Sequence, residues 1–564
     1  MQLLIVKSDI MKKYFFYLLS VVLLFFSFVS CKGGDPPKPP EVVVLSIESV
    51  QVNEQAWLNN SMLYNVSIAQ KPIIKITFNN PIDISKFNSS LISFSAVIGT
   101  DYSLSTSDDK KTLIFSLNSL PVAYTEYSIS IAQGDNLGGY VNPDFTAKYI
   151  TQIDPAPKFP TITDDELLTK VQSQTFKFFW DYAHPVSGLA RERLGSGEIV
   201  TTGGSGFGLM AILVGIQRGF ITRQQGFERL NQIVNFLNRT ETDKFHGVFP
   251  HWMNGTTGKV IPFGTKDNGA DLIETSFLMQ GLLTVQSFFK NGSASEQAMC
   301  AAIQNLWEKV EWTWFQKNGE NQLYWHWSPT YNWEMNMPIH GWNEGLIAYI
   351  LAASSPTFPI TKAVYDEGWA RNGAMKNGSQ FYNITLPLGE NFGGPMFFAH
   401  YSFLGLDPRN LSDKYANYWS QNTAHAKINY NYCVANPRGY YGYSENCWGL
   451  TASDIQNSYT ASSPTNDVGV IAPTAALASF PYTPDESMKA LKYFYYTLGD
   501  RIWGDYGFVD AFNLKDRWFA NSYLAIDQGP IIVMIENYRT GLLWNYFMQN
   551  QNIKSGLTKL GFMY

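Results

Sequence analysis

The sequence predicts two domains, an all-β sandwich followed by an all-α domain built as an (α/α)6 barrel, that is, a toroid of paired helices. Three observations predict this organisation. A chain of 564 residues exceeds what one hydrophobic core usually serves. Short alternating apolar runs fill the first part of the chain, and helical periodicity fills the part after residue 160. Hydrophobic residues make up 45% of the chain and charged residues 16%, which is typical of a folded protein.

The charge distribution excludes one class of partner. The formal net charge is -6, and no run of Lys or Arg lies along one face of an expected element. Proteins that bind nucleic acid carry a basic patch or stripe. We therefore expect no nucleic-acid partner.

The first residues have the pattern of an export signal. Lys12 and Lys13 precede an apolar run over residues 14–29, and Ser30-Cys31 follows at once. A small residue before Cys at the end of such a run resembles a bacterial lipobox, so we expect residues 1–31 to be a lipoprotein signal with Cys31 acylated. A single transmembrane anchor is the alternative, although the run is short for a span. The expected location is periplasmic or anchored in the outer membrane.

Two segments separate this signal from the helical part. Residues 32–41 carry four prolines and two glycines and predict an extended tether. Residues 42–153 contain alternating runs such as 73–78, 112–116 and 127–131, bounded by Asn, Asp, Gly and Pro. This spacing is typical of an all-β sandwich and resembles bacterial Ig-like domains. We expect a spacer or accessory module there.

The period of the hydrophobic pattern changes after the Pro-rich segment 154–160, and the helical domain is predicted over residues 160–564. Between the helices, long loops rich in Gly, Trp, Tyr and acidic residues are typical of a toroid with functional loops, not of a simple bundle. The apolar spacing predicts helices near 164–182, 205–219, 223–237, 269–289, 296–315, 342–354, 412–430, 467–478, 484–497 and 534–549.

The first chemical cluster is KDNGADLIET, residues 266–275. A helix that begins near Gly269 places Asp271 and Glu274 on one face of its first turn, with Asp267 just before it. Hydrolysis of a glycosidic bond needs one carboxylic acid and one carboxylate, and these residues can supply either role. They can equally be capping residues, since acids favour helix N-termini.

The second cluster interleaves tryptophans with polar residues. Indole faces pack against the C–H faces of sugar rings while polar neighbours bind the hydroxyl groups. Glu344 opens the next apolar stretch, and it can be a catalytic acid or a helix-start residue. The candidate sugar-binding residues here are Trp325, His326, Trp327, Trp333 and Asn343.

A third cluster joins RER at 191–193 to TTGGSGFG at 201–208, with His251 and Trp252 in a further aromatic loop. The glycines lack the Lys-Ser/Thr of a phosphate-binding loop, so we expect close backbone approach at a helix entrance. Arg191 and Arg193 are candidates to orient hydroxyls or carboxylates. Asp527, before Pro530, can face the same cavity or begin a helix.

The sequence lacks the motifs of metal-dependent and serine-nucleophile catalysis. The seven His form no H-E-x-x-H and no tight Cys/His group, so we expect neither a metal site nor a cofactor. No G-x-S-x-G elbow is present. Cys433 and Cys447 can pair in an oxidising compartment, although their spacing does not require it. Cys300 is expected to be a buried thiol.

Long motifs in order from about residue 165 to the end are similar to the glycoamylase-like domain family, especially glycoside hydrolase family 144. The resemblance implies an (α/α)6 barrel that hydrolyses β-1,2-glucans with inversion. It maps the family's candidate acids onto Asp267, Asp271, Glu274 and Glu344. One departure is Ala270, where the family pattern has a second Gly. The motifs are RERL, VTTGGSGFG, FPHWMNGTTGKVIPF, KDNGADLIETSFLMQGLL, YWHWSPTYNWEMN, GWNEGLIAYILAASSP and AIDQGPIIVMIENYRTGLLW.

Two alternatives stay open at this point. A non-catalytic glycan-binding lipoprotein would use the same tryptophans without opposed carboxylates, and a glycosidase or lyase could act on another polysaccharide. The expected partners are a glucan or oligosaccharide and, through the lipid, a membrane. We expect Glu344 to face the group around Asp271 and Glu274 across the cavity.

Overall fold

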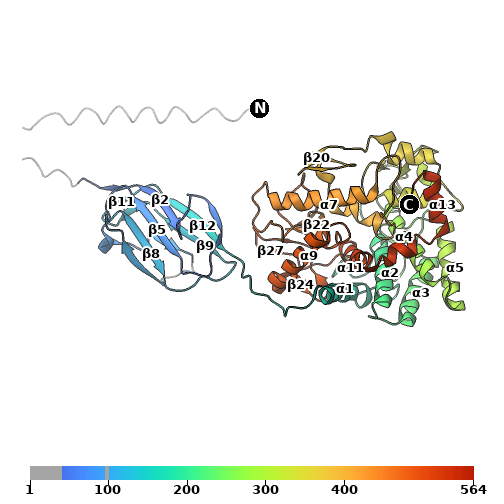
Figure 1. Ribbon diagram of the computed structural model, residues 1–564, viewed down its shortest axis with the longest axis horizontal. Coiled ribbons are helices and arrows are strands. Elements are labelled where there is room, and N and C mark those ends of the chain that lie inside the picture. The colour runs from blue at the N-terminus through green and yellow to red at the C-terminus, as the bar shows by residue number, and fades with distance from the viewer. Residues whose placement is uncertain (1–40, 96–100) are drawn as a thin grey trace, which may run out of the picture. The chain divides into compact units, whose positions relative to one another are not determined.

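The computed structural model describes residues 41–95 and 101–564 and divides the chain into two compact units (Figure 1). The first unit ends at Ile153 and the second runs from Asp154 to Tyr564. The expected signal of residues 1–31 with Cys31, and the expected tether as far as residue 40, lie outside the described residues. Within the described part, no helix is both long and apolar enough to cross a membrane.

The first unit is built of strands. Its sheets have the orders β3-β2-β5-β8-β7, β4-β12-β9-β6 and β1-β11-β10, mostly antiparallel. The strands are β1 (Val44–Leu45), β2 (Ile47–Val52), β3 (Gln55–Ala56), β4 (Met62–Val66), β5 (Ile73–Phe78), β6 (Ile92–Phe94), β7 (Tyr102–Thr106), β8 (Thr112–Leu117), β9 (Glu126–Ile131), β10 (Gly134–Asn136), β11 (Gly139–Val141) and β12 (Phe145–Thr151).

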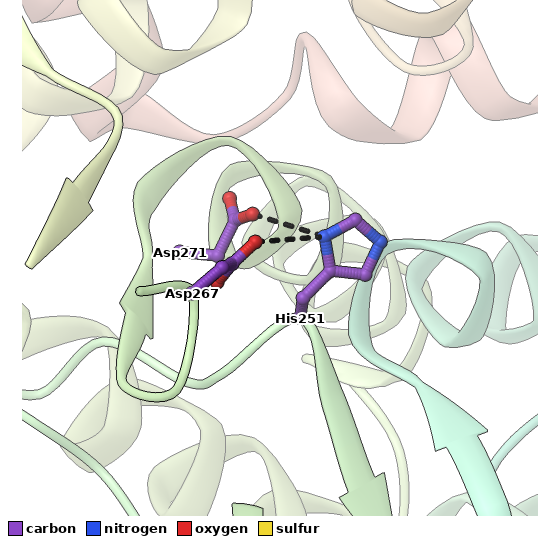
Figure 2. A group of neighbouring side chains, drawn as sticks. All are labelled: His251, Asp267 and Asp271. Atoms are coloured by element: carbon purple, nitrogen blue, oxygen red, sulfur yellow. Dashed lines mark hydrogen bonds and ion pairs between the residues drawn. The ribbon is translucent and has the colours of Figure 1, made fainter. Parts of the chain in front are cut away.

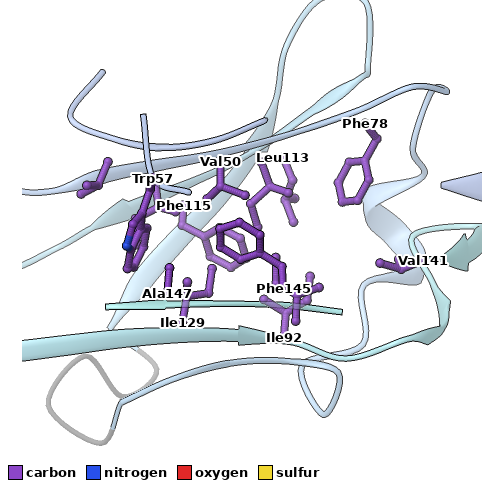
Figure 3. Close-up of a cluster of buried hydrophobic side chains, with 14 of the residues drawn as sticks. Val50, Trp57, Phe78, Ile92, Leu113, Phe115, Ile129, Val141, Phe145 and Ala147 are labelled. Atoms are coloured by element: carbon purple, nitrogen blue, oxygen red, sulfur yellow. The ribbon is translucent and has the colours of Figure 1, made fainter. Parts of the chain in front are cut away.

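The alternation of apolar and polar residues gives this unit its core. In β5 and β8 every second side chain is buried, and these side chains meet those of β9 and β12 in one cluster (Figure 3). Phe115 lies at the centre, with Phe94 and Tyr102 packed edge-on against it at ring-centroid distances of 4.9 and 5.2 Å. The core is therefore filled by strands from both larger sheets.

Most helices of the second unit are of two kinds. One kind is buried along most of its length: α2 (Thr202–Gln217), α4 (Leu272–Phe289), α6 (Leu346–Ser354), α8 (Pro473–Leu477) and α11 (Ala525–Thr540). The other kind buries one face: α1 (Asp164–Trp180), α3 (Arg223–Asn238), α5 (Ala294–Glu308), α9 (Pro484–Lys492) and α13 (Gln551–Leu560). We call these the inner and outer helices. The others are α7 (Tyr418–Ala435), α10 (Gly499–Ile502) and α12 (Leu542–Phe547).

Outer helices pack on inner ones, which is why they need only one apolar stripe. Helix α1 contacts α2 and α11 (Figure 1). Helix α9 contacts α8, and α13 contacts α6. Helix α2 packs between α4 and α11. Helices α1, α3 and α5 each begin with a capping box, formed by Thr163 with Glu166, Thr222 with Gln225 and Ser293 with Glu296.

Several predicted boundaries are wrong. The helix expected at 412–430 is α7, that expected at 467–478 begins only at Pro473, and that expected at 296–315 ends at Glu308. The glycine run 203–208 lies inside α2, which begins at Thr202 and not near 205. The last predicted helix, 534–549, is instead α11 from Ala525 to Thr540, which contains Pro530 and ends at Gly541, followed by α12. Proline opposes a helix interior, but residues 525–537 are nearly all buried against α2 and α8, and this packing outweighs the local penalty.

Close packing of α2 on α4 explains the glycines. A Cβ added to Gly206 would meet the backbone carbonyl of Phe277, and one added to Gly281 would meet the backbone carbonyl of Gly206. Each glycine therefore lets the two helix backbones approach. The close approach of the two helices places the first turns of α2 and α4 beside each other.

Short strands lead into the inner helices and form the loops around their N-termini. Strand β13 (Ile199–Thr201) runs into α2, and β16 (Ala270–Asp271) runs into α4. Their partners and the remaining strands are β14 (Trp252–Asn254), β15 (Val260–Ile261), β17 (Leu323–Tyr324), β18 (His326–Trp327), β19 (Pro338–Ile339), β20 (Gln380–Phe381), β21 (Ile384–Thr385), β22 (Ala452–Ile455), β23 (Ser458–Ala461), β24 (Trp503–Gly504), β25 (Gly507–Phe508), β26 (Phe512–Asn513) and β27 (Trp518–Phe519).

Candidate active site

The N-termini of the inner helices carry buried carboxyl groups. Asp271 is the N-cap of α4, and its Oδ1 accepts a hydrogen bond of 2.9 Å from the backbone N–H of Glu274. Glu274 Oε2 accepts from the backbone N–H of Gly203 in the first turn of α2, at 2.7 Å. Both acids are buried. The capping role weighed from the sequence is present for Asp271, and the same carboxylate also contacts the rest of the cluster.

His251 gathers three carboxyl groups around one ring. Its Nδ1 lies 3.2 Å from Asp271 Oδ2 and 4.0 Å from Asp267 Oδ2 (Figure 2), and its Nε2 lies 4.0 Å from Glu274 Oε1. His326 Nε2 lies 3.5 Å from Asp267 and 3.6 Å from Asp271. The β16–β18 pairing puts His326 opposite Asp271, which explains this approach.

These contacts shift the pKa values of the cluster in different directions. Burial disfavours a charged His251, but the charges of Glu274, Asp271 and Asp267 outweigh it and raise the pKa of His251 to about 9. Burial and the charge of Asp271 raise the pKa of Asp267 to about 7. Burial also raises the pKa of Glu274, whereas the two histidines hold that of Asp271 below its usual value in spite of burial. At neutral pH the cluster thus pairs a charged His251 with an ionised Asp271.

Glu344 lies directly before α6 and belongs to the same electrostatic environment. Burial, with the charges of Glu274 and Asp271, raises the pKa of Glu344 to about 7. Its Oε2 is buried and has no hydrogen-bond partner among the described residues. A carboxyl group kept partly protonated at neutral pH can donate a proton to a leaving oxygen.

A second acidic cluster surrounds Asp527 in the first turn of α11. Arg193 Nη1 binds Asp454 Oδ1 at 3.0 Å, and the backbone N–H of Asp454 donates to Asp510 Oδ2 at 2.7 Å. Asp510 and Asp527 interact through their side chains. Burial and the charge of Asp454 raise the pKa of Asp510 to about 7, and burial with the charge of Asp510 raises the pKa of Asp527 well above its usual value. Two buried carboxyl groups so placed share a proton.

Tyr401 links the two clusters. Burial and the negative charges of Asp527, Glu344 and Glu274 raise the pKa of its hydroxyl far above the usual value. The hydroxyl is therefore within electrostatic reach of the N-termini of α4, α6 and α11. Contacts bring the sequence motifs at 271–274, 344 and 527 into one region: the Tyr401 ring packs on Phe277 of α4, Ser402 Oγ donates to the carbonyl oxygen of Glu344, and α2 packs on both α4 and α11.

The group His251, Asp267 and Asp271 could hold a metal ion, since one ligand atom from each lies within 4.8 Å of the others. The pKa of about 9 for His251 opposes this at neutral pH, because a protonated imidazole donates hydrogen bonds and does not ligate. A metal would have to displace that proton.

The predicted aromatic residues fall into two groups according to the rings they contact. Trp252 packs edge-on against His251, and Trp325 stacks on His326 with ring centroids 5.7 Å apart. Trp327 and Trp333 instead pack with Trp314, at 6.2 and 6.4 Å. Trp252 and Trp325 therefore border the carboxyl cluster directly, whereas Trp327 and Trp333 join a neighbouring aromatic group.

Two of the predicted polar residues make local contacts. Arg191 donates to the carbonyl oxygens of Tyr182 and Gly197, both at 2.8 Å, which fixes the loop that carries it. Asn343 Oδ1 accepts from the backbone N–H of Gly345 at 2.8 Å, so it shapes the turn into α6. The structure places neither in contact with the carboxyl cluster.

Sequence reasoning missed Asp454, Asp510 and Tyr401. One signal could have found Asp510, since it stands alone in the apolar run Phe508–Phe512 and an acid so placed must be buried with a partner. The described cysteines, Cys300, Cys433 and Cys447, are free and buried.

Comparison with known proteins places the chain in a family. Residues 336–551 match the family model "Glycoamylase: Putative glucoamylase". A crystal structure titled as a putative glucoamylase from Bacteroides uniformis is 57% identical, covers 72% of this chain and 99% of its own, and superposes with a TM-score of 0.71. An endo-β-1,2-glucanase from Chitinophaga pinensis, solved with sophorotriose and glucose, is 52% identical over 72% of this chain and 99% of its own, with a TM-score of 0.70.

A curated relative gives a further match. An exo β-1,2-glucooligosaccharide sophorohydrolase from Parabacteroides distasonis is 48% identical over 421 residues, which are 71% of this chain and 58% of the relative. This chain thus covers less than two thirds of that relative's length. The matches of more than half identity, over whole solved chains, show that the protein belongs to the glycoamylase family.

Proposed function

We propose that the second unit is a glycoside hydrolase that cleaves β-1,2-linked glucan or glucooligosaccharides. The observation that carries this proposal is the gathering of buried carboxyl groups at the N-termini of α4, α6 and α11, in a chain that is 52% identical to an endo-β-1,2-glucanase. Hydrolysis of a glycosidic bond requires a proton donor and a carboxylate on opposite sides of the bond. This region supplies both protonation states at neutral pH.

Glu344 is the proposed general acid. Its raised pKa keeps it partly protonated near pH 7, and its buried Oε2 lacks a partner among the described residues. The opposed carboxylate comes from the entrance of α4, where Asp271 is ionised and Glu274 is the neighbouring acid. With a water between the acid and the base, the product has inverted configuration.

The charged His251 has a positioning role in this scheme. It lies between Asp271 and Glu274, at 3.2 and 4.0 Å from its two ring nitrogens, and its charge offsets their repulsion. Trp252 and Trp325, beside the cluster, are proposed to pack against glucose rings. The inner and outer helices, paired as α1 with α2, α9 with α8 and α13 with α6, support an (α/α)6 toroid as the fold of this unit.

For the rest of the chain we propose an Ig-like accessory module at 42–153 and a lipid anchor at Cys31. The anchor rests on the apolar run 14–29 followed by Ser30-Cys31. It would place the enzyme in the periplasm or on the outer membrane. Cys31→Ser in the full-length chain should abolish incorporation of labelled fatty acid and release the protein from the membrane fraction.

The activity is tested with linear β-1,2-glucan as the substrate. The purified protein is incubated with the glucan, the products are separated by size, and the anomeric signals are followed by NMR from the first minutes. We expect short β-1,2-linked products whose first-formed reducing ends have the α configuration. Their size distribution separates endo from exo cleavage.

Other outcomes select the alternatives. Binding of the glucan without any product would identify a glycan-binding protein. An unsaturated product that absorbs in the ultraviolet would identify a lyase. Cleavage of an α-linked or β-1,3-linked glucan, with β-1,2-glucan left intact, would reject the proposed substrate.

A further inference from the structure

A cavity of about 550 Å³ lies beside the second acidic cluster. It is bordered by the hairpin β22–β23, by the chain from β27 to Ser522 and by Arg193. Pockets for small ligands commonly have volumes of 300–1,000 Å³, so this one has room for a sugar unit with its linkage. Its lining does not include His251 or the three carboxyl groups around that ring.

The polar side of the cavity is held by hydrogen bonds. Arg193 binds Asp454 at 3.0 Å and Glu192 at 2.9 Å, and Ser522 Oγ donates to Asp454 Oδ2 at 2.6 Å. Because Arg193 is already paired with two carboxylates, it offers little net positive charge to a phosphate or sulfate. The spare acceptor capacity of Asp454 and the amide of Asn521 suit hydroxyl groups. A neutral, hydroxyl-rich ligand fits this chemistry.

Aromatic rings form the other side. Tyr459 in β23 is 46% exposed, and Trp518 in β27 is half-buried. Exposed aromatic side chains beside hydrogen-bonding groups are typical of sites that bind pyranose rings. The aromatic faces pack on the C–H groups of the sugar. The first unit and the outer helices contribute no residue to this lining among the described residues.

Hydrogen bonds join the lining of the cavity to the second acidic cluster and to the start of α11. The backbone N–H of Asp454, which lines the cavity, donates to Asp510 Oδ2 at 2.7 Å, and the backbone N–H of Ala525 at the start of α11 donates to the carbonyl oxygen of Glu192, next to Arg193, at 2.9 Å. A glucan chain in the active site could therefore continue into the cavity.

We propose that this cavity is a glucosyl subsite, formed by Tyr459, Trp518, Arg193 and Asp454, that binds the substrate chain beyond the cleaved bond and sets product length. The inference rests on the proposed function, because it assigns a part of the glucan chain to the cavity. Removing an exposed aromatic side chain from this subsite lowers the affinity for long substrates but does not change the rate of bond cleavage.

The test compares Tyr459→Ala and Trp518→Ala with the wild type on β-1,2-glucan and on short β-1,2-glucooligosaccharides. We expect KM for the glucan to rise about tenfold, as for loss of an aromatic anchor, with kcat on the shortest cleaved substrate nearly unchanged and the product lengths shifted. Tyr459→Phe, which keeps the ring, should restore most of the affinity. The matched control is Tyr382→Ala, at a residue that is 37% exposed on the β20–β21 hairpin.

Calorimetric titration of short β-1,2-glucooligosaccharides into Glu344→Gln protein, with and without Tyr459→Ala, measures binding without turnover. Equal affinities, or a KM and product pattern for Tyr459→Ala like those of Tyr382→Ala, would overturn the subsite. An equal loss of kcat on all substrates would also overturn it and would show a role in the chemical step. If the wild type leaves β-1,2-glucan uncleaved, the proposed function itself fails, which is a different result.

Discussion

At the scale of single residues, the acids combine a structural role with a chemical one. Asp271 caps α4 and also fixes the charge of His251. A residue that only capped the helix could be replaced by Asn or Ser at little cost. Here the same change would leave His251 without its nearest carboxylate, so the two roles cannot be separated by mutation alone.

The proposed acid gives the sharpest prediction for a single residue. Glu344→Gln removes the proton donor and should lower kcat by about 10²- to 10⁴-fold, the range found for general acids. Because the pKa of Glu344 is raised to about 7, activity of the wild type should fall as the pH rises through that value and the group ionises. The measurement is initial rate against pH on short β-1,2-glucooligosaccharides.

An exposed acid serves as the control for that variant. Glu334 pairs with Lys266 at 2.6 Å on the surface, so Glu334→Gln should keep the rate and the pH profile of the wild type. If Glu344→Gln keeps a wild-type rate, Glu344 is not the acid. If Glu344→Gln is less active but its rate still falls over the same alkaline pH range as the wild type, that fall is due to another group.

His251 predicts a pH dependence of stability. Its folded-state pKa of about 9 lies above the unfolded value of about 6.5. The charged His251 therefore contributes stability that is fully present below pH 6.5 and is lost as the pH rises through 9. His251→Gln should lower the midpoint of thermal unfolding by several degrees at pH 6 and by much less at pH 10.

Thermal unfolding followed by circular dichroism at both pH values measures this difference. His340→Gln is the control, since His340 is exposed and has a lowered pKa, so it should not reproduce the loss between pH 6.5 and 9. An equal destabilisation by His251→Gln at pH 6 and pH 10 would mean that packing, not charge, accounts for the contribution of His251.

At the scale of elements, the approach of α2 to α4 positions the site. Gly281→Ala places a methyl group against the backbone of Gly206, where only a shift of a whole helix relieves the contact. We expect destabilisation of about 1–3 kcal/mol or more, with a loss of activity, because Gly203 on α2 holds Glu274 on α4. Urea unfolding and the rate on β-1,2-glucan measure the two effects.

The matched control is the same change in another helix. A Cβ on Gly226 in α3 meets the end of the Ile216 side chain, which can rotate away. Gly226→Ala should therefore cost less stability and leave the rate unchanged. A Gly281→Ala protein as stable and active as Gly226→Ala would show that the helices tolerate separation.

The elements also show what the sequence could predict. Helices with an apolar stripe and a capping box, such as α1 and α3, follow from local pattern, and so does the cluster at the entrance of α4. The start of α2 and the first half of α11 do not, because glycines and Pro530 oppose a helix locally and only burial between other helices stabilises these segments. The Asp510–Asp527 pair joins residues 17 positions apart through tertiary packing, which no local pattern contains.

At the scale of the whole molecule, the two units have different tasks. The first unit buries its own core between its sheets, and the carboxyl groups of both clusters all lie in the second. The proposed cavity subsite is also formed by the second unit alone. The first unit is therefore expected to contribute nothing to the chemistry on a soluble substrate.

Residues 154–564, produced alone, should fold and cleave short β-1,2-glucooligosaccharides with a kcat/KM within about twofold of residues 42–564, since a domain with its own core can fold independently. The comparison uses matched concentrations and thermal unfolding to confirm that both proteins are folded. Residues 154–564 with Glu344→Gln set the background rate. A folded but inactive second unit would mean that residues 42–153 complete the active site, and the division of tasks would then be wrong. Equal rates on short substrates with a raised KM on long glucan would instead give the first unit a role in holding the polymer, because that loss would require contacts that only a long chain can reach.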